Sequence, residues 1–117
     1  HHELPVIDEL DDWLAGLPHP TGLLTSGGFT AIMAVESARR IGLSVPDSLS
    51  VLSRSDDNVC LFADPPISSF RSVGKVIGEL ALSLLIQHFN GAVLPTGELK
   101  LPVPSVVERL STGVPAG

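Results

Sequence analysis

The stretch that decides the fold is GLLTSGGFTAIMAVESARRIGL, residues 22–43, which joins a short apolar run, a Ser-Gly-Gly turn and a helical pattern. The run from Gly22 to Thr25 is typical of a strand inside a parallel sheet. The pattern from Phe29 to Ile41 predicts a helix, and Gly42 follows it as a suitable stop. A second strand is predicted at Leu49 to Ser53. Strand, helix and strand together indicate a parallel crossover, which is almost always right-handed.

Two further helices are predicted, one on each side of this unit. Residues 6–17 carry apolar side chains at helical spacing, and Pro18 and Pro20 end that pattern. Ser72 to Asn90 reads as a longer helix, with Ser72 as its cap and Asn90-Gly91 as its stop. Its apolar residues fall on two stripes, so we expect it to be sandwiched or to pack on something outside its own layer.

One or two final strands are predicted within residues 97–111, and residues 113–117 are expected to be a loose tail. The alternation of helices and strands predicts an α/β fold, a parallel sheet with flanking helices in three layers. Two or three strands make a thin sheet. We therefore expect the chain to be part of a larger architecture.

Composition narrows the class of protein. The 117 residues are 44% hydrophobic and 17% charged, which excludes a disordered chain and suggests that part of the surface is normally covered. With a net charge of -6, the chain has no excess of positive charge that would attract nucleic acid. The single cysteine fits a reducing cytoplasm, and the acidic first twelve residues do not resemble a signal peptide. No apolar run is long enough to cross a membrane.

The Ser-Gly-Gly turn allows three interpretations. Gly27 and Gly28 could present backbone N–H groups to a phosphate, could serve a purely steric need, or could belong to a loop for another ligand. Neither the dinucleotide pattern nor the P-loop pattern is present, and the next basic residue is Arg39. The phosphate interpretation is therefore the weakest of the three.

A second polar turn, Arg54-Ser55-Asp56-Asp57, follows the second strand. Ligands of open parallel sheets bind beyond the carboxyl ends of the strands, so the two turns are expected to lie side by side. The carboxylates could accept hydrogen bonds from ligand hydroxyls, or they could cap a following turn and face water. We predict no catalytic residue, metal site or cofactor, because no nucleophile–base pair or metal-ligand spacing occurs.

The run Val59-Cys60-Leu61-Phe62 is predicted to be a loop between the acidic turn and a double proline. It could tuck under the sheet or could meet a second subunit, and we favour the interface. Within it, Cys60 is expected to be a packing residue and not a reactive thiolate.

Four segments together resemble the LacI/GalR family of transcriptional regulators: residues 20–57, DPPISSFRS, GELALSLLIQHFNG and LPVPSVVERLST. The family pattern has a strand opening into Ala-Asn-Asp, a Gly-aromatic-Asp-Asp turn, a Pro-Pro segment and a long helix. The resemblance implies that residues 1–112 are the C-terminal portion of a two-lobed, periplasmic-binding-protein-like effector domain. The DNA-binding headpiece and most of the first lobe would be missing.

The resemblance also implies a function. The protein would be a cytoplasmic, homodimeric repressor that senses a sugar or a related small polar effector. DNA would be bound only through the absent domain, and no membrane would be involved. A transport-type solute-binding protein, or a small α/β enzyme, is the alternative.

Site residues follow from the same alignment of motifs. At the effector site the family's Asn-Asp falls on Gly27 and Gly28, and the first Asp of its Asp-Asp pair falls on Ser55, which weakens two usual partners for a sugar. The predicted effector residues are Ser26, Gly27, Gly28, Phe29, Arg54, Ser55, Asp56, Asp57 and Ser72. The predicted dimer residues are Ile32, Val59, Cys60, Leu61 and Phe62.

Overall fold

A computed structural model describes residues 5–114. Its elements are α1 (Pro5–Ala15), β1 (Thr21–Thr25), α2 (Gly28–Arg40), β2 (Leu49–Ser53), α3 (Asn58–Phe62), β3 (Ser68–Phe70), α4 (Gly74–Phe89) and β4 (Val106–Val107). The chain divides into two compact units. Unit 1 extends to Arg71 and resumes at Val106, and unit 2 is Ser72–Ser105.

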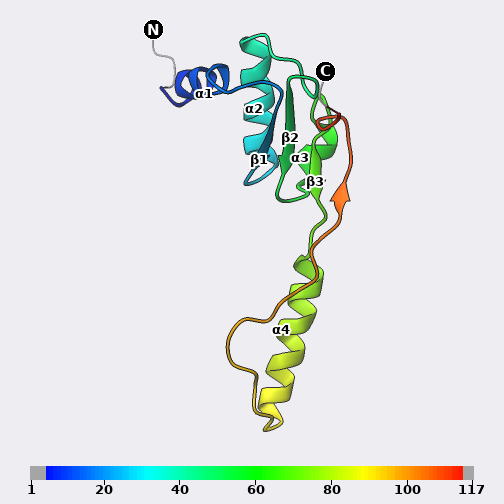
Figure 1. The fold of residues 1–117 in the computed structure, drawn as a ribbon. Coiled ribbons are helices and arrows are strands. Elements are labelled where there is room, and N and C mark those ends of the chain that lie inside the picture. Colours follow the sequence, from blue (N-terminus) through cyan, green and yellow to red (C-terminus); the bar gives the residue numbers. More distant parts are fainter. Residues whose placement is uncertain (1–4, 115–117) are drawn as a thin grey trace. The chain divides into compact units, whose positions relative to one another are not determined.

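The sheet lies in unit 1 and has the order β1-β2-β3-β4 (Figure 1). β1 and β2 are parallel, from Thr21 opposite Leu49 to Thr25 opposite Ser53, and β3 is parallel to β2. β4 is antiparallel to β3, because the chain leaves unit 1 along β3 and returns beside it in the opposite direction. The predicted α/β fold is thus confirmed, with a mostly parallel sheet.

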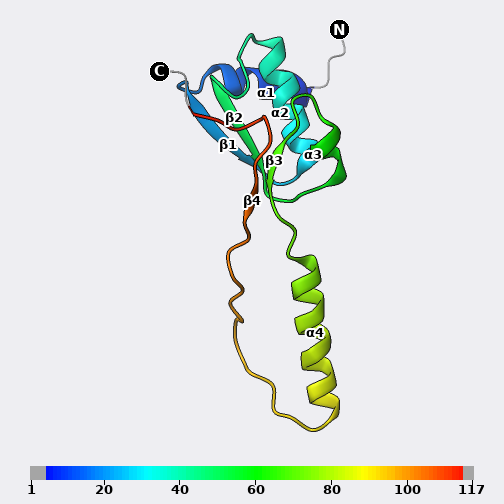
Figure 2. The same cartoon turned by 90° about the vertical axis from the view of Figure 1, so that its right-hand side faces the viewer.

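The core of unit 1 forms where α1, α2 and α3 meet one face of the sheet. Leu14 of α1, Val35 of α2, Val51 of β2 and Cys60 of α3 are buried there in one cluster. Figures 1 and 2 show α1 and α2 on the same side of β1 and β2. Leu24, on the other face, is 60% exposed.

The helices of the described part of unit 1 therefore pack on one face of its sheet. Successive crossovers of one hand that progress in one direction place their helices on one face of a sheet. The strand order β1-β2-β3 is such a progression, and its connections are α2 and α3.

Several predicted boundaries are corrected. Residues 58–62 form the short helix α3 and not a loop, and the sequence does not predict β3 at Ser68–Phe70. α4 begins at Gly74 and not at Ser72, although the Ser72 hydroxyl accepts a hydrogen bond from the Gly74 N–H (3.3 Å). Gly42 and Gly91, with φ of +83° and +86°, confirm the predicted helix stops.

The C-terminal segment is fastened to the sheet by serines. Ser111 Oγ donates to the Val51 carbonyl (2.6 Å) and accepts from the Ser68 N–H (2.8 Å), and all three residues are buried. The Gly113 N–H donates to Ser50 Oγ (3.3 Å), so the expected loose tail is attached at its first residue. Residues 115–117 lie outside the described part.

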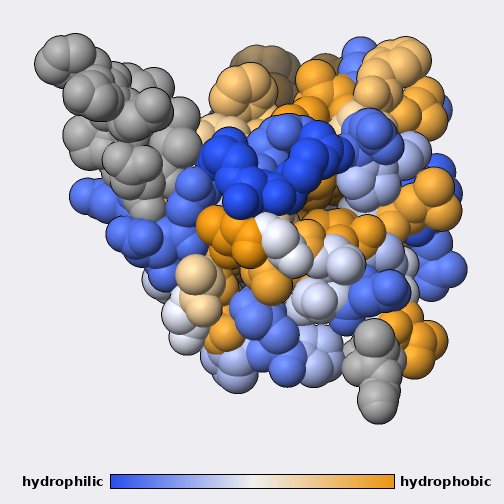
Figure 3. Space-filling view, turned by 90° about the horizontal axis from the view of Figure 1, so that it is seen from above, coloured by the Kyte–Doolittle hydropathy of each residue, from blue (hydrophilic) through white to orange (hydrophobic). Residues whose placement is uncertain are grey.

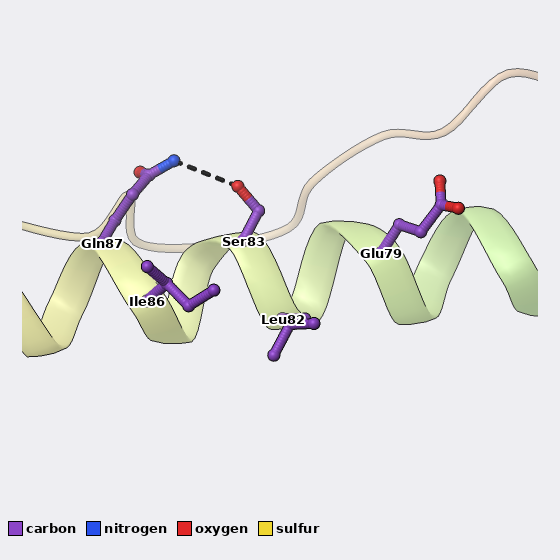
Figure 4. Close-up of a pocket in the computed structure, with 5 residues that line it drawn as sticks. All are labelled: Glu79, Leu82, Ser83, Ile86 and Gln87. Carbon is purple, nitrogen blue, oxygen red and sulfur yellow. Dashed lines mark hydrogen bonds between the residues drawn. The ribbon is translucent and has the colours of Figure 1, made fainter.

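Unit 2 consists of α4 and the segment that follows it. None of the residues of α4 is buried, and Leu82, Leu85, Ile86 and Phe89 are each more than half exposed. A shallow hollow of about 310 Å³ lies along one side of this helix (Figure 4). Gln87 donates a hydrogen bond to Ser83 there (3.3 Å), and Leu82 and Ile86 lie beside it. No helix among the described residues is long and apolar enough to span a membrane.

Candidate functional site

The carboxyl ends of β1 and β2 lie side by side, as the sequence predicts. The Arg54 N–H donates to the Thr25 carbonyl (2.9 Å), which joins the two strand ends. The Gly27-Gly28 turn follows β1 and leads directly into α2, while residues 54–57 follow β2 and lead into α3. The Gly28 N–H donates to Asp57 Oδ2 (2.8 Å), so the two turns are in direct contact. We refer to these two turns, residues 26–28 and 54–57, as the strand-end site.

The steric interpretation of the glycines has direct support in the structure. A Cβ atom on Gly28 would lie 2.8 Å from both Cys60 Sγ and Val59 Cγ2. Real Cβ contacts are essentially never that short, so α3 can approach the start of α2 only because residue 28 has no side chain. On Gly27 a Cβ would lie 3.2 Å from Asp57 Oδ2, which is also tight.

Asp57 closes the position where a phosphate would bind. Its carboxylate accepts the hydrogen bond from Gly28, at the positive end of the α2 dipole. Ser55 Oγ lies 3.1 Å from both carboxylate oxygens of Asp57 and donates to them. The helix terminus already holds an anion from its own chain, and this finding weighs against the phosphate interpretation.

Asp56 is held by residues that the sequence analysis did not assign to the site. Its Oδ1 accepts hydrogen bonds from Arg109 Nη2 (2.9 Å) and from Ser69 Oγ (2.9 Å). Partial burial on its own would raise the pKa of Asp56, but the hydrogen bonds from Arg109 and Ser69 outweigh it and hold the pKa below its usual value. Arg109 is a contact of the site that the sequence did not predict, and the available signal was the basic residue in the closing LPVPSVVERLST motif.

The remaining predicted effector residues are open to solvent. Ser26, Phe29 and Arg54 are exposed beside these turns, and Phe29 is 72% exposed. Ser26 Oγ lies 3.4 Å from Thr30 Oγ1. Ser72 belongs to unit 2, so it is not among the residues that the structure brings together here.

The predicted dimer residues differ in how far they are exposed. Val59, Leu61 and Phe62 are exposed on α3, whereas Ile32 is only partly exposed on α2. Cys60, also on α3, is fully buried, and this corrects its prediction as an interface contact. Its side chain turns into the core beside Gly28, and burial raises the pKa of its thiol. Cys60 is a packing cysteine, as predicted.

Hydrophobic side chains also reach the surface elsewhere. Figure 3 shows them interleaved with hydrophilic ones on the face turned toward the viewer. A hollow of about 270 Å³ lies on the open face of the sheet and not at the strand-end site. It is lined by Gly22, Leu23, Leu24, Ser50, Leu52 and Thr112.

Comparison with known proteins identifies the family to which this fold belongs. Residues 2–112 match the family of periplasmic binding protein-like domains. The chain belongs to this family. The domain is 30% identical over 97 residues to the transcriptional regulator MalR of Streptomyces coelicolor, covering 83% of this chain and 28% of MalR. It is 33% identical over 72 residues to the lactose operon repressor of Rhizobium radiobacter, covering 62% of this chain and 64% of that repressor.

Solved structures agree on the fold. A LacI family regulator from Bifidobacterium animalis matches 94% of this chain and 40% of its own chain, with a TM-score of 0.80 and 25% identity. A dimeric Lac repressor with a C-terminal deletion matches with a TM-score of 0.77 and 24% identity, over 40% of its chain. The predicted resemblance to LacI/GalR effector domains is confirmed. The relatives are transcriptional regulators and not enzymes, and this domain spans about 28% of the length of MalR.

Proposed function

We propose that this domain is the C-terminal portion of the effector-binding domain of a LacI-type transcriptional regulator. It contributes the strand-end site to a pocket for a small polar effector, a sugar or a related molecule. The pairing of the two turns by the Gly28–Asp57 hydrogen bond carries this proposal. It brings the ends of two parallel strands together where ligands of open α/β sheets bind.

The exposed character of α4 supports the proposal that the chain is one part of a larger domain. Helices that are apolar on several sides are stable when other elements cover them. The regulators that this chain matches are longer, since it spans about 28% of MalR. We infer that α4 packs against the remaining parts of the effector domain.

Control of DNA binding would be indirect. The net charge of -6 gives this domain no means of attracting DNA, so a separate domain would make that contact. An effector that binds one of two conformations more tightly shifts the population toward it, and the shift changes how a dimer presents its DNA-binding domains. The exposed apolar residues of α3 would form part of that dimer interface.

Two measurements test this function. The coding sequence upstream of residue 1 is expected to encode a helix-turn-helix and further α/β pattern, whereas a signal peptide there would instead indicate a solute-binding protein. Calorimetric titration of the full-length protein with lactose and cellobiose, the sugars named for two structural relatives, is expected to show binding of at least one. Replacement of Ser26 and Arg54 by alanine should weaken that binding. An unchanged affinity would contradict the site.

A further inference from the structure

Asp56 is predicted from the sequence as an effector residue, but its surroundings point to a different role. Its Oδ1 atom already accepts two hydrogen bonds, from Arg109 and from Ser69. The side chains of Arg109 and Asp56 are only 14% and 26% exposed, so solvent and salt screen this ion pair less than a surface pair. A ligand hydroxyl that approached Oδ1 would compete with charge-assisted hydrogen bonds that are present without it.

Arg109 is itself held by hydrogen bonds of its guanidinium and of its backbone N–H. Its Nη1 donates to the Ile67 carbonyl (2.6 Å) and to Ser69 Oγ (3.3 Å), while its Nη2 donates to Asp56. Its backbone N–H donates to Ser68 Oγ (2.9 Å). The planar guanidinium therefore joins the turn after β2 to the segment before β3 and to β3 itself.

These partners occupy a special place in the chain. β3 ends at Phe70, just before the chain leaves unit 1 at Arg71. β4 begins at Val106, where the chain re-enters unit 1, and Arg109 follows shortly after it. Ser69 is paired with Val107 across these two strands. Asp56 thus contacts the outgoing strand and the segment that continues the returning strand.

We propose that Asp56 is a positioning residue that, through Arg109 and Ser69, couples the strand-end site to the two strands joining unit 1 to unit 2. This inference rests on the proposed function only in taking the strand-end site as the place where an effector binds. A ligand that displaces the turn at residues 54–57 would shift Asp56. It would thereby loosen or tighten the β3–β4 pair without touching either strand. Ligand contact at this turn then belongs to its exposed neighbours, Arg54 above all.

The charges around Asp56 give the coupling a pH dependence. Arg109, beyond β4, and Arg71, beyond β3, both favour its ionised form, and Arg54 and Asp57 flank it in the same turn. Because the pKa of Asp56 in the folded chain is lowered from 3.8, the network is complete at neutral pH. It is lost only as the pH falls through that lowered value.

Hydrogen exchange at single-amide resolution in the full-length protein tests the proposal. Two variants, Asp56→Ala and its matched control Asp57→Ala, each remove one carboxylate from the same turn. Asp56→Ala is expected to speed exchange of the Arg109 and Ser68 amides about tenfold and to leave the Gly28 amide unchanged. Asp57→Ala is expected to do the reverse, because the Gly28 amide donates its hydrogen bond to Asp57.

A conservative variant, Asp56→Asn, distinguishes a positioning role of Asp56 from a general effect on stability. Asp56→Asn retains an acceptor for Ser69 but not the charge, so an intermediate exchange rate is expected at Arg109. It also serves if Asp56→Ala does not fold. In the unmodified protein, protection of the Arg109 amide, corrected for intrinsic exchange, should fall as the pH drops below the usual range of aspartate. Asp56→Asn should show no such step.

Two results would overturn the proposal: Arg109 and Ser68 amides that keep their rates in Asp56→Ala, or an equal acceleration of every amide. Addition of lactose gives an independent reading. A lactose-induced change of exchange at Arg109 that Asp56→Asn abolishes supports the coupling. If lactose changes nothing while the variants behave as expected, the choice of effector is contradicted and the positioning role stands.

Discussion

Helices α2 and α4 have comparable lengths, 13 and 16 residues, but opposite environments. α2 buries Ala31, Ala34, Val35 and Ala38 against the sheet and its neighbouring helices, whereas none of the residues of α4 is buried. Sequence pattern makes both segments helical, but only packing makes a helix stable in a protein. The comparison teaches that unit 1 has its own core, while unit 2 presents an apolar helix that needs covering.

The largest expected effect comes from truncating one leucine in each region. Leu49 is fully buried in β2, so Leu49→Ala should lower the free energy of unfolding by about 2–5 kcal/mol through lost burial and a new cavity. Leu82 is 59% exposed on α4, so Leu82→Ala in this chain alone should change it by less than about 0.5 kcal/mol. Urea denaturation measures both values.

The same pair of variants also tests the larger architecture. If the rest of an effector domain covers α4, Leu82→Ala should become about as costly as Leu49→Ala in the full-length protein. A cost for Leu82→Ala that stays small in the full-length protein would show that this side of α4 remains uncovered.

A smaller effect is expected from adding one methyl group to a glycine in each region. Gly28→Ala should destabilise unit 1 by about 1–3 kcal/mol, because its Cβ would overlap Cys60 and Val59. Gly78 lies in α4, and a Cβ added there would meet nothing within 4 Å, so Gly78→Ala should raise helix stability by roughly 0.5–1 kcal/mol. Thermal unfolding followed by circular dichroism distinguishes the opposite signs, and equal signs would refute the steric account of Gly28.

The smallest effect on unfolding is expected on the exposed apolar side chains of α3. Leu61 and Phe62 are 57% and 81% exposed, so Leu61→Glu with Phe62→Ser should leave the stability of unit 1 within about 0.5 kcal/mol. The same double variant should convert a dimer of the full-length protein to a monomer, because it places a charge in an apolar interface. Light scattering measures the mass. If the double variant remains a dimer, the interface lies elsewhere.

Local pattern was sufficient for β1, α2 and β2. Each has a run of suitable residues and a clear end, such as Gly42 after α2. α3 and β3 were missed because five and three residues are too few to show a period. β3 also begins with Ser68 and Ser69, which are polar but fully buried. They are tolerated there because their hydroxyls are hydrogen-bonded: Ser68 Oγ to Thr112 Oγ1 and the Arg109 N–H, and Ser69 Oγ to Arg109 Nη1 and Asp56 Oδ1.

The sequence by itself determined that the turns after β1 and β2 meet, because parallel strands bring their carboxyl ends to one edge. It also determined the family, through motifs spread along the chain. Only the tertiary structure decided what the polar residues of the strand-end site contact. Asp57 holds the start of α2, and Asp56 holds Arg109, 53 residues away along the chain. Such pairings depend on the angle and distance at which the folded segments approach each other, and no local spacing encodes these.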